Sequence, residues 1–199
     1  MNVRVGIAMF VSVLALVGCA ESMPSRLPAA TTQPTGSGIV IARIQTLLLG
    51  PSPRAYAPRL EFLELEQAET KRRVRADVMD DESWLVLALE PGPYRVTRLR
   101  IQEGPYAAMA DVDLAFAVAP HRVSDLGIWR IGVDPPQVQR TILLSVTANP
   151  NDGMEFLSRE YPTLAALPNT AELPTPVMQE ARLYEVSPYP LVRYFRRRW

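Results

Sequence analysis

The amino-acid sequence predicts a mainly β protein, an antiparallel β-sandwich with one short helix toward its C-terminus. Short segments in the middle of the chain carry apolar residues at every second position, which is the period of a strand with one buried face. Turn signals separate these segments, and the 19 prolines cluster outside them, because strands within a sheet need their backbone N–H groups. The 48% hydrophobic content is sufficient for a packed core in a chain of 199 residues.

The first 18 residues have the organisation of an export signal. A short basic start precedes an apolar stretch over 5–17, which is too short to span a bilayer, and Leu16-Val17-Gly18-Cys19 closes the segment. This segment resembles a bacterial lipoprotein signal peptide with its lipobox. The resemblance implies cleavage before Cys19 and attachment of diacylglycerol to its thiol. The alternatives are an ordinary signal peptide and an apolar N-terminus that happens to contain a cysteine.

The resemblance also implies a location in the cell. Ala20 is not the aspartate that commonly retains lipoproteins in the inner membrane, so the chain is expected on the periplasmic face of the outer membrane. Several acyl chains would make that anchorage stable. Residues 19–37 are then expected to form a flexible tether, because they are rich in Pro, Ser, Thr and Ala and carry few large apolar side chains. The sandwich domain is expected over 38–162.

Three segments precede the centre of the predicted sheet. Residues 38–49 are rich in β-branched side chains and are bounded by glycines, which indicates a buried strand. Residues 59–67 are ambiguous because their apolar positions change parity midway, so a bulged strand and a short amphipathic helix both fit. Residues 73–79 alternate apolar and polar side chains and favour a strand.

Two consecutive hairpins are predicted over 84–133. In the first, leucines recur at every second position from 85 to 89, and the return strand is expected over 94–101. The Pro-Gly-Pro break at 91–93 between them favours a chain reversal, because proline fixes φ and lacks a backbone donor. The second hairpin combines the clean alternation of 111–118 with a return strand over 128–133.

A last strand and a helix follow. Residues 141–147 supply the strand, and the helix is predicted over 150–161 because Asn149 is a good N-cap, Pro150 suits the first helical position and Pro162 ends the element. Residues 163–199 contain several prolines and show no sustained periodicity. They are expected to be an extended segment, laid over the surface or mobile, that ends in a basic and aromatic tail.

One stretch adds a family resemblance. Leu89-Glu90-Pro91-Gly92-Pro93-Tyr94-Arg95-Val96 resembles the turn and strand of transthyretin-like sandwiches, also called prealbumin-like or carboxypeptidase-regulatory-like domains. Residues 118–131, with Asp125-Leu126-Gly127, resemble a later segment of bacterial lipoproteins. The resemblance implies that Tyr94 packs its ring under the turn and bonds a backbone group through its hydroxyl. It also implies an accessory or binding role.

Composition excludes some function classes. The formal net charge is zero, so no electrostatic case exists for nucleic acid as a partner. The single cysteine excludes an internal disulfide. The one histidine, His121, lies in a predicted turn near Asp125, Asp111 and Asp113, and its spacing matches no metal or catalytic motif. The acidic run 80–82 lacks the pattern of a calcium loop.

No catalytic residue, metal ligand or cofactor is therefore predicted, apart from the covalent lipid on Cys19. The C-terminal tail is the one further candidate for a contact with a membrane or with an envelope protein, because it combines cationic and interface-favouring aromatic side chains. A disordered tail without a role is the alternative. The candidate contact residues are Arg193, Tyr194, Phe195, Arg196, Arg197, Arg198 and Trp199.

The sequence thus predicts a lipid-anchored envelope lipoprotein that acts as a non-catalytic binding or structural module. Two alternatives remain open. One is an envelope hydrolase or metal-dependent enzyme that uses His121 with nearby acids. The other is an accessory subunit of an envelope assembly, joined through strand addition at a sheet edge.

Overall fold

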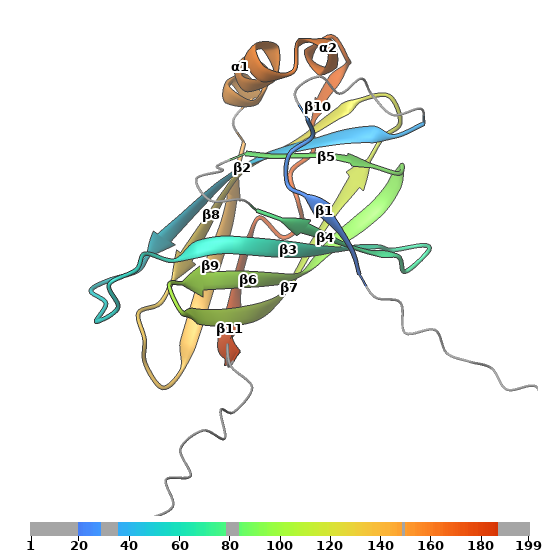
Figure 1. Ribbon diagram of the computed structural model, residues 1–199. Helices are drawn as coiled ribbons and strands as arrows, with labels where there is room; N and C mark the ends of the chain where they lie inside the picture. Colours follow the sequence, from blue (N-terminus) through green and yellow to red (C-terminus); the bar gives the residue numbers. More distant parts are fainter. Residues whose placement is uncertain (1–19, 29–35, 79–83, 149, 187–199) are drawn as a thin grey trace, which may run out of the picture.

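The computed structural model describes residues 20–28, 36–78, 84–148 and 150–186. Within these residues the protein is mainly β, with a short helix toward the C-terminus, as the sequence predicts (Figure 1). The elements in chain order are β1 (Glu21–Pro24), β2 (Gly38–Leu48), β3 (Arg59–Gln67), β4 (Arg73–Asp77), β5 (Trp84–Leu89), β6 (Gly92–Glu103), β7 (Tyr106–Val118), β8 (Val123–Val133), β9 (Arg140–Thr147), α1 (Pro150–Glu160), α2 (Pro162–Ala165), β10 (Asn169–Ala171) and β11 (Met178–Val186).

The strands form one curled sheet of mixed direction. Its order is β1-β4-β3-β6-β7-β11-β9-β8-β2-β5, and β10 lies beside β8. Most neighbours are antiparallel, but β1 with β4, β2 with β8 and β10 with β8 are parallel. The series of hydrogen-bonded strands is unbroken, so the prediction of an antiparallel sandwich is corrected to a single mixed sheet. None of the described helices is long and apolar enough to cross a membrane.

The two edges of the sheet meet at residues 25–27. The amide of Ser25 donates to the Asp77 carbonyl beside β4 at 2.9 Å, while the Val86 amide on β5 donates to the Ser25 carbonyl at 2.7 Å. The amide of Leu27 donates to the Val86 carbonyl at 3.1 Å. We call this double contact the seam. The prediction of a flexible tether does not hold for residues 20–28, because backbone hydrogen bonds on both sides order a segment that is poor in apolar residues.

Neither of the two predicted hairpins forms, although the four strands predicted for them are all present. β5 pairs with β2 and not with β6, and β7 pairs with β6 and β11 and not with β8. The hairpins of the structure are instead β3–β4, β6–β7 and β8–β9. The reason is that alternation reports which face of a strand is buried and carries no information on its partner.

β3 resolves the ambiguity over 59–67 in favour of a bulged strand. Its pairing with β6 shifts register twice, between Leu60 and Phe62 and between Glu64 and Leu65. These shifts explain the change of parity in the sequence, because Leu60, Phe62, Leu63 and Leu65 are all buried.

The C-terminal part of the chain differs from the prediction. The helix α1 matches the range expected, but the segment predicted to be extended over 163–199 contains a strand inside the sheet. β11 lies between β7 and β9 and pairs with both. The sequence of β11 shows little alternation, because only Ala181 and Leu183 of this strand are buried. The strand is held in the sheet by backbone hydrogen bonds to its two neighbours, which the side-chain pattern does not reveal.

Apolar side chains form two clusters. The larger cluster fills the interior of the curl and includes Trp129, Leu99 and Leu114. In the smaller cluster, α1 and α2 pack on the outer face of β2, β5 and β8, where Phe156 and Leu157 meet Ile39. Both faces of β8 are therefore buried.

Candidate functional site

A cavity opens at the end of the sheet where β1, β2, β4 and β6 begin and where β3 and β5 end. Its volume is about 390 Å³, which is within the range of pockets that hold small molecules. Strands from both edges of the sheet line it, so the cavity exists only because the two edges meet at the seam.

The wall of the cavity is largely apolar. Met23, Val74 and Leu89 line it together with Tyr94, whose ring stacks on Phe116 with 5.8 Å between the centroids. Burial, followed by the charge of Glu90, raises the pKa of this tyrosine. Tyr94 is therefore buried, as the sequence predicts, and the backbone partner of its hydroxyl stays a prediction.

The rim of the cavity carries a three-membered charge arrangement. Arg72 is ion-paired with Glu21 at 2.6 Å and with Glu90 at 2.8 Å. The three side chains are 47%, 64% and 60% exposed. The pKa of Arg72 is raised first by its hydrogen bond with Glu21 and then by the charges of both glutamates. Two carboxylates and one guanidinium give the rim a formal charge of −1.

Gln67 fixes the shape of this mouth. Its side chain is buried in the wall, its amide nitrogen donates to the Pro91 carbonyl at 3.4 Å, and its amide oxygen accepts from the Thr70 hydroxyl at 2.5 Å. The residue therefore connects the turn between β3 and β4 to the short connection between β5 and β6.

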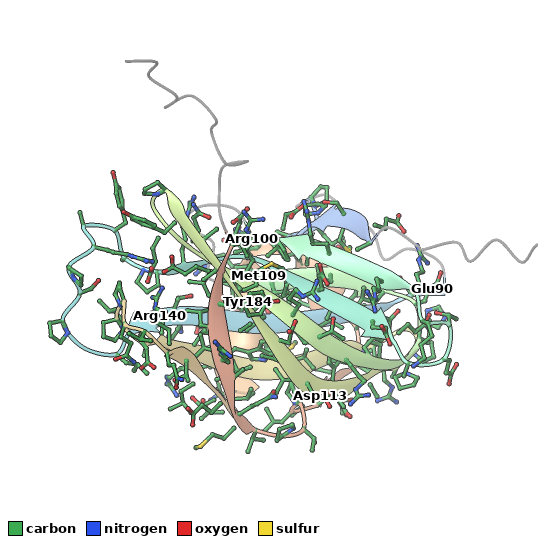
Figure 2. All side chains as sticks on the ribbon, turned by 90° about the horizontal axis from the view of Figure 1, so that it is seen from below. Glu90, Arg100, Met109, Asp113, Arg140 and Tyr184 are labelled. Carbon is green, nitrogen blue, oxygen red and sulfur yellow. The ribbon has the colours of Figure 1, made fainter. Side chains whose placement is uncertain are left out.

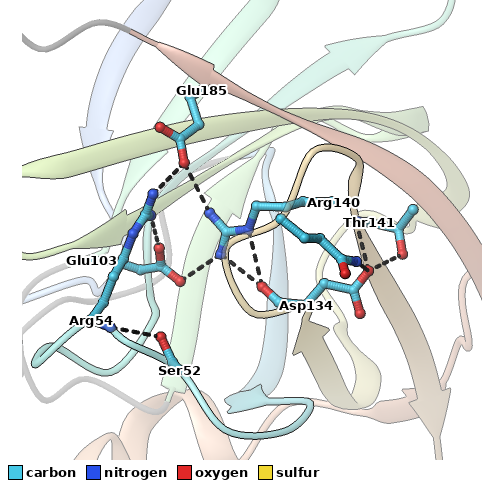
Figure 3. Close-up of polar contacts among 8 residues, drawn as sticks. Ser52, Arg54, Glu103, Asp134, Arg140, Thr141 and Glu185 are labelled. Atoms are coloured by element: carbon cyan, nitrogen blue, oxygen red, sulfur yellow. Dashed lines mark hydrogen bonds and ion pairs between the residues drawn. The ribbon is translucent and has the colours of Figure 1, made fainter.

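The opposite end of the sheet contains a buried ion-pair network (Figure 3). Arg140 is paired with Glu103 at 2.7 Å, and each of these side chains is only 3% exposed. Arg54, from the loop after β2, is paired with both Glu103 and Glu185, and Arg140 reaches Glu185 at 3.4 Å. Two guanidinium groups and two carboxylates balance in charge, which is the condition under which buried charges are tolerated.

Backbone and hydroxyl groups complete this network. Arg140 also donates to the Asp134 carbonyl from Nε at 3.1 Å and from Nη2 at 2.8 Å. The Asp134 carboxylate accepts from the amide and the hydroxyl of Thr141 at 2.9 and 2.7 Å. The loop between β8 and β9 is therefore fastened to the network.

The sequence pattern contains one signal for the buried charge arrangement and none for the exposed one. Glu103 lies at the same parity as the buried Leu99 and Ile101 on β6, and Arg140 at the same parity as Ile142 on β9. A charged residue in the buried register of a strand indicates a buried partner.

The residues considered around the single histidine do not converge. His121 is exposed in the turn between β7 and β8, Asp111 pairs with Arg98 at 3.0 Å, and Asp113 pairs with Arg95. No group of three or more metal-ligating side chains occurs in the described part of the chain.

Asp125 is instead buried beneath α1. Its Oδ1 accepts from the Gly127 amide at 2.9 Å, while its Oδ2 is buried without a hydrogen bond. Burial raises the pKa of this carboxyl, and the Gly127 hydrogen bond opposes the shift. A β-carbon at Gly153 would lie 2.7 Å from Oδ2, so α1 can approach β8 here only with a glycine at this position.

The other predicted sites, which are Cys19, the acidic run 80–82 and the tail residues 193–199, lie outside the described residues. Comparison of the chain with protein families, with curated proteins and with solved structures gives no match.

Proposed function

We propose that the protein is a lipid-anchored lipoprotein of the cell envelope, acylated at Cys19, whose curled sheet acts as a non-catalytic binding module. The proposed location is the periplasmic face of the outer membrane. The likeness of residues 89–96 to transthyretin-like turns, a family with accessory and binding roles, is consistent with this proposal but stays a prediction.

The observation that carries the proposal is the position of the cavity relative to the lipobox. β1 begins at Glu21, only two positions after Cys19, and Glu21 itself lines the cavity. A chain of two residues spans at most about 7 Å. A lipid on Cys19 would therefore be held beside the mouth of a cavity of ligand-binding size, which gives the anchor a direct relation to the binding site.

Acylation can be tested with a clickable palmitate analogue fed to cells that express the full chain. The wild-type protein is expected to be labelled and to fractionate with membranes, and the Cys19→Ser variant is expected to lose both properties. Ser22→Ala is the matched control, because it alters a small polar residue near the anchor without removing the thiol. Equal labelling of wild type and Cys19→Ser would contradict the proposal.

The tail is proposed as a contact for an envelope partner. Crosslinking in intact cells followed by mass spectrometry would compare the full chain with a chain truncated before Arg193. A defined partner that is lost on truncation would support a recognition role for the tail. A partner retained by the truncated chain would assign recognition to the sheet and its loops instead.

A further inference from the structure

The cavity and the buried ion-pair network occupy opposite ends of the same curled sheet. Tyr94 and Glu103 are nine positions apart on β6, which corresponds to roughly 30 Å along a strand. Figure 2 shows Glu90 at one end of the molecule and Arg140 at the other. The end with Arg140 carries charged side chains that neutralise one another, whereas the cavity lies at the end with Glu90.

That open end is also the end nearest to the anchor. The sequence composition predicts a tether between membrane and domain, but the seam orders residues 25–27 against both sheet edges. Only Ala20 separates Cys19 from β1. A domain attached so closely cannot stand off from the bilayer, and the cavity mouth is therefore held at the membrane surface.

The chemistry of the cavity fits an amphiphile. Its wall offers Met23, Val74 and Leu89 to an apolar chain, and its rim offers carboxylates on both sides of one guanidinium. An ammonium group matches Glu21 and Glu90, and a phosphate matches Arg72. These two charges occur together in a zwitterionic phospholipid headgroup.

We propose that the cavity binds a phospholipid with an amine-bearing headgroup, taken from the membrane that anchors the protein. This inference rests on the proposed acylation of Cys19 for the orientation of the mouth. One of the two acyl chains of the phospholipid would lie against the apolar wall, and the headgroup would remain at the half-solvated rim.

Separation of the Arg72 ion pairs, which ligand entry at the rim requires, would cost little free energy. The pairs of Arg72 are solvent-exposed, and exposed ion pairs contribute little to stability. A zwitterion supplies new partners to all three side chains as they separate. An anionic phospholipid without an amine would supply a partner only to Arg72 and would bring its negative charge close to two carboxylates. The rim therefore discriminates between headgroups.

The test uses the full chain, purified from membranes and reconstituted into phosphatidylglycerol vesicles. These vesicles contain a trace of phospholipid with a photoactivatable group at the end of one acyl chain and with either an ethanolamine or a glycerol headgroup. After illumination, crosslinked peptides are mapped by mass spectrometry. We expect crosslinks at Met23, Val74 and Leu89, on the order of tenfold more abundant with the ethanolamine probe.

Variants separate the wall from the rim. Met23→Trp fills the cavity and is expected to remove the crosslinks, whereas Met154→Trp, a half-buried methionine on α1 outside the cavity, should leave them unchanged. If Met23→Trp does not fold, the surface variant Glu21→Gln/Glu90→Gln still tests the rim and should abolish the headgroup preference. Its matched control is Arg95→Gln/Asp113→Asn, an exposed ion pair on the outer face.

Three results would overturn the inference. The first is crosslinking confined to exposed residues, and the second is equal cavity crosslinking with the two headgroups. The third is crosslinking in the cavity of the Cys19→Ser chain but not in that of the wild-type chain. This result would mean that the acyl group on Cys19 of the wild-type chain occupies the cavity. Palmitate labelling of Cys19 is scored separately, so a failure of the anchor and a failure of the lipid site give different results.

Discussion

Arg72 and Arg140 each bridge two glutamates, at opposite ends of one sheet. Arg72 joins Glu21 to Glu90 at the mouth of the cavity, and the three side chains are about half exposed or more. Arg140 joins Glu103 to Glu185, and it is buried together with Glu103. Water reaches all three side chains of the first arrangement, whereas in the second it is excluded from Arg140 and Glu103 and reaches only Glu185, which is 48% exposed.

The difference shows that ion pairs of the same composition, one arginine with two glutamates, have different effects on the protein when they are buried and when they are exposed. Charges removed from water are costly unless they are paired, so the Arg140 network holds the chain in one arrangement. Exposed charges exchange partners at little cost, so the Arg72 rim can reorganise around a ligand. Substitutions of Arg140 and of Arg72 test this contrast directly, and two substitutions at the buried Asp125 carboxyl extend it to a buried charge without an arginine.

Arg140→Met is expected to have the largest effect. It leaves Glu103 buried with Arg54 as its remaining charged partner, and removal of one member of a buried pair typically costs about 3–5 kcal/mol. Urea unfolding followed by tryptophan fluorescence measures the loss. The double substitution Arg140→Met/Glu103→Leu should recover part of the stability, because no charge is then left without its partner. A loss below about 1 kcal/mol for Arg140→Met would contradict the importance of burial.

Gly153→Ala tests a buried carboxyl that has no arginine. Alanine is favoured over glycine within a helix by about 1 kcal/mol, but its β-carbon would lie 2.7 Å from Asp125 Oδ2. Overpacking typically costs about 1–3 kcal/mol, so we expect a net loss of stability by thermal unfolding. In an Asp125→Ala background the same change should be neutral or stabilising. An equal effect in both backgrounds would show that the two residues are not coupled.

Asp125→Asn is expected to change the pH dependence of stability. Because burial raises the pKa of Asp125 in the folded chain, the contribution of this group is fully present below its unfolded-state pKa and is lost as the pH rises through the folded-state pKa. Asparagine does not ionise, so the stability of the variant relative to wild type should increase from acidic to neutral pH. A stability difference that is independent of pH would refute the assignment.

Arg72→Met is expected to have the smallest effect on stability. The residue is exposed, and loss of its pairs should cost about 0–1 kcal/mol. The loss should decrease further at high salt, because salt screens exposed charges. Urea unfolding at low and high ionic strength measures both quantities. A cost equal to that of Arg140→Met would remove the distinction between the two ends.

The sequence predicts the strands much better than it predicts their partners. Alternation locates β7 and β9 because each has one buried face, and cap residues locate α1. The same alternation assigns β5 to β6 in error, since a period of two contains no information on which strand lies alongside. The seam was also missed, because β1 is held by backbone groups and its composition is that of a linker.

The two charge arrangements differ in how far the sequence could reveal them. Glu103 and Arg140 occupy buried registers of their strands, so parity alone could have indicated a buried pair. Glu21, Arg72 and Glu90 come from three segments that are far apart in the chain, and their side chains are exposed. Only the pairing of strands brings them together, and the cavity that they surround was therefore beyond prediction.

The seam also determines the order in which the molecule can be completed. Ser25 precedes its partners Asp77 and Val86 by more than fifty positions in the chain. Contacts at such separation form late, because loop closure must precede them. As the chain is synthesised from its N-terminus, residues 25–27 can make these contacts only after β4 and β5 have been added. Two unpaired strand edges are open to other chains during that interval, so this is the stage at which assistance from a chaperone would matter most.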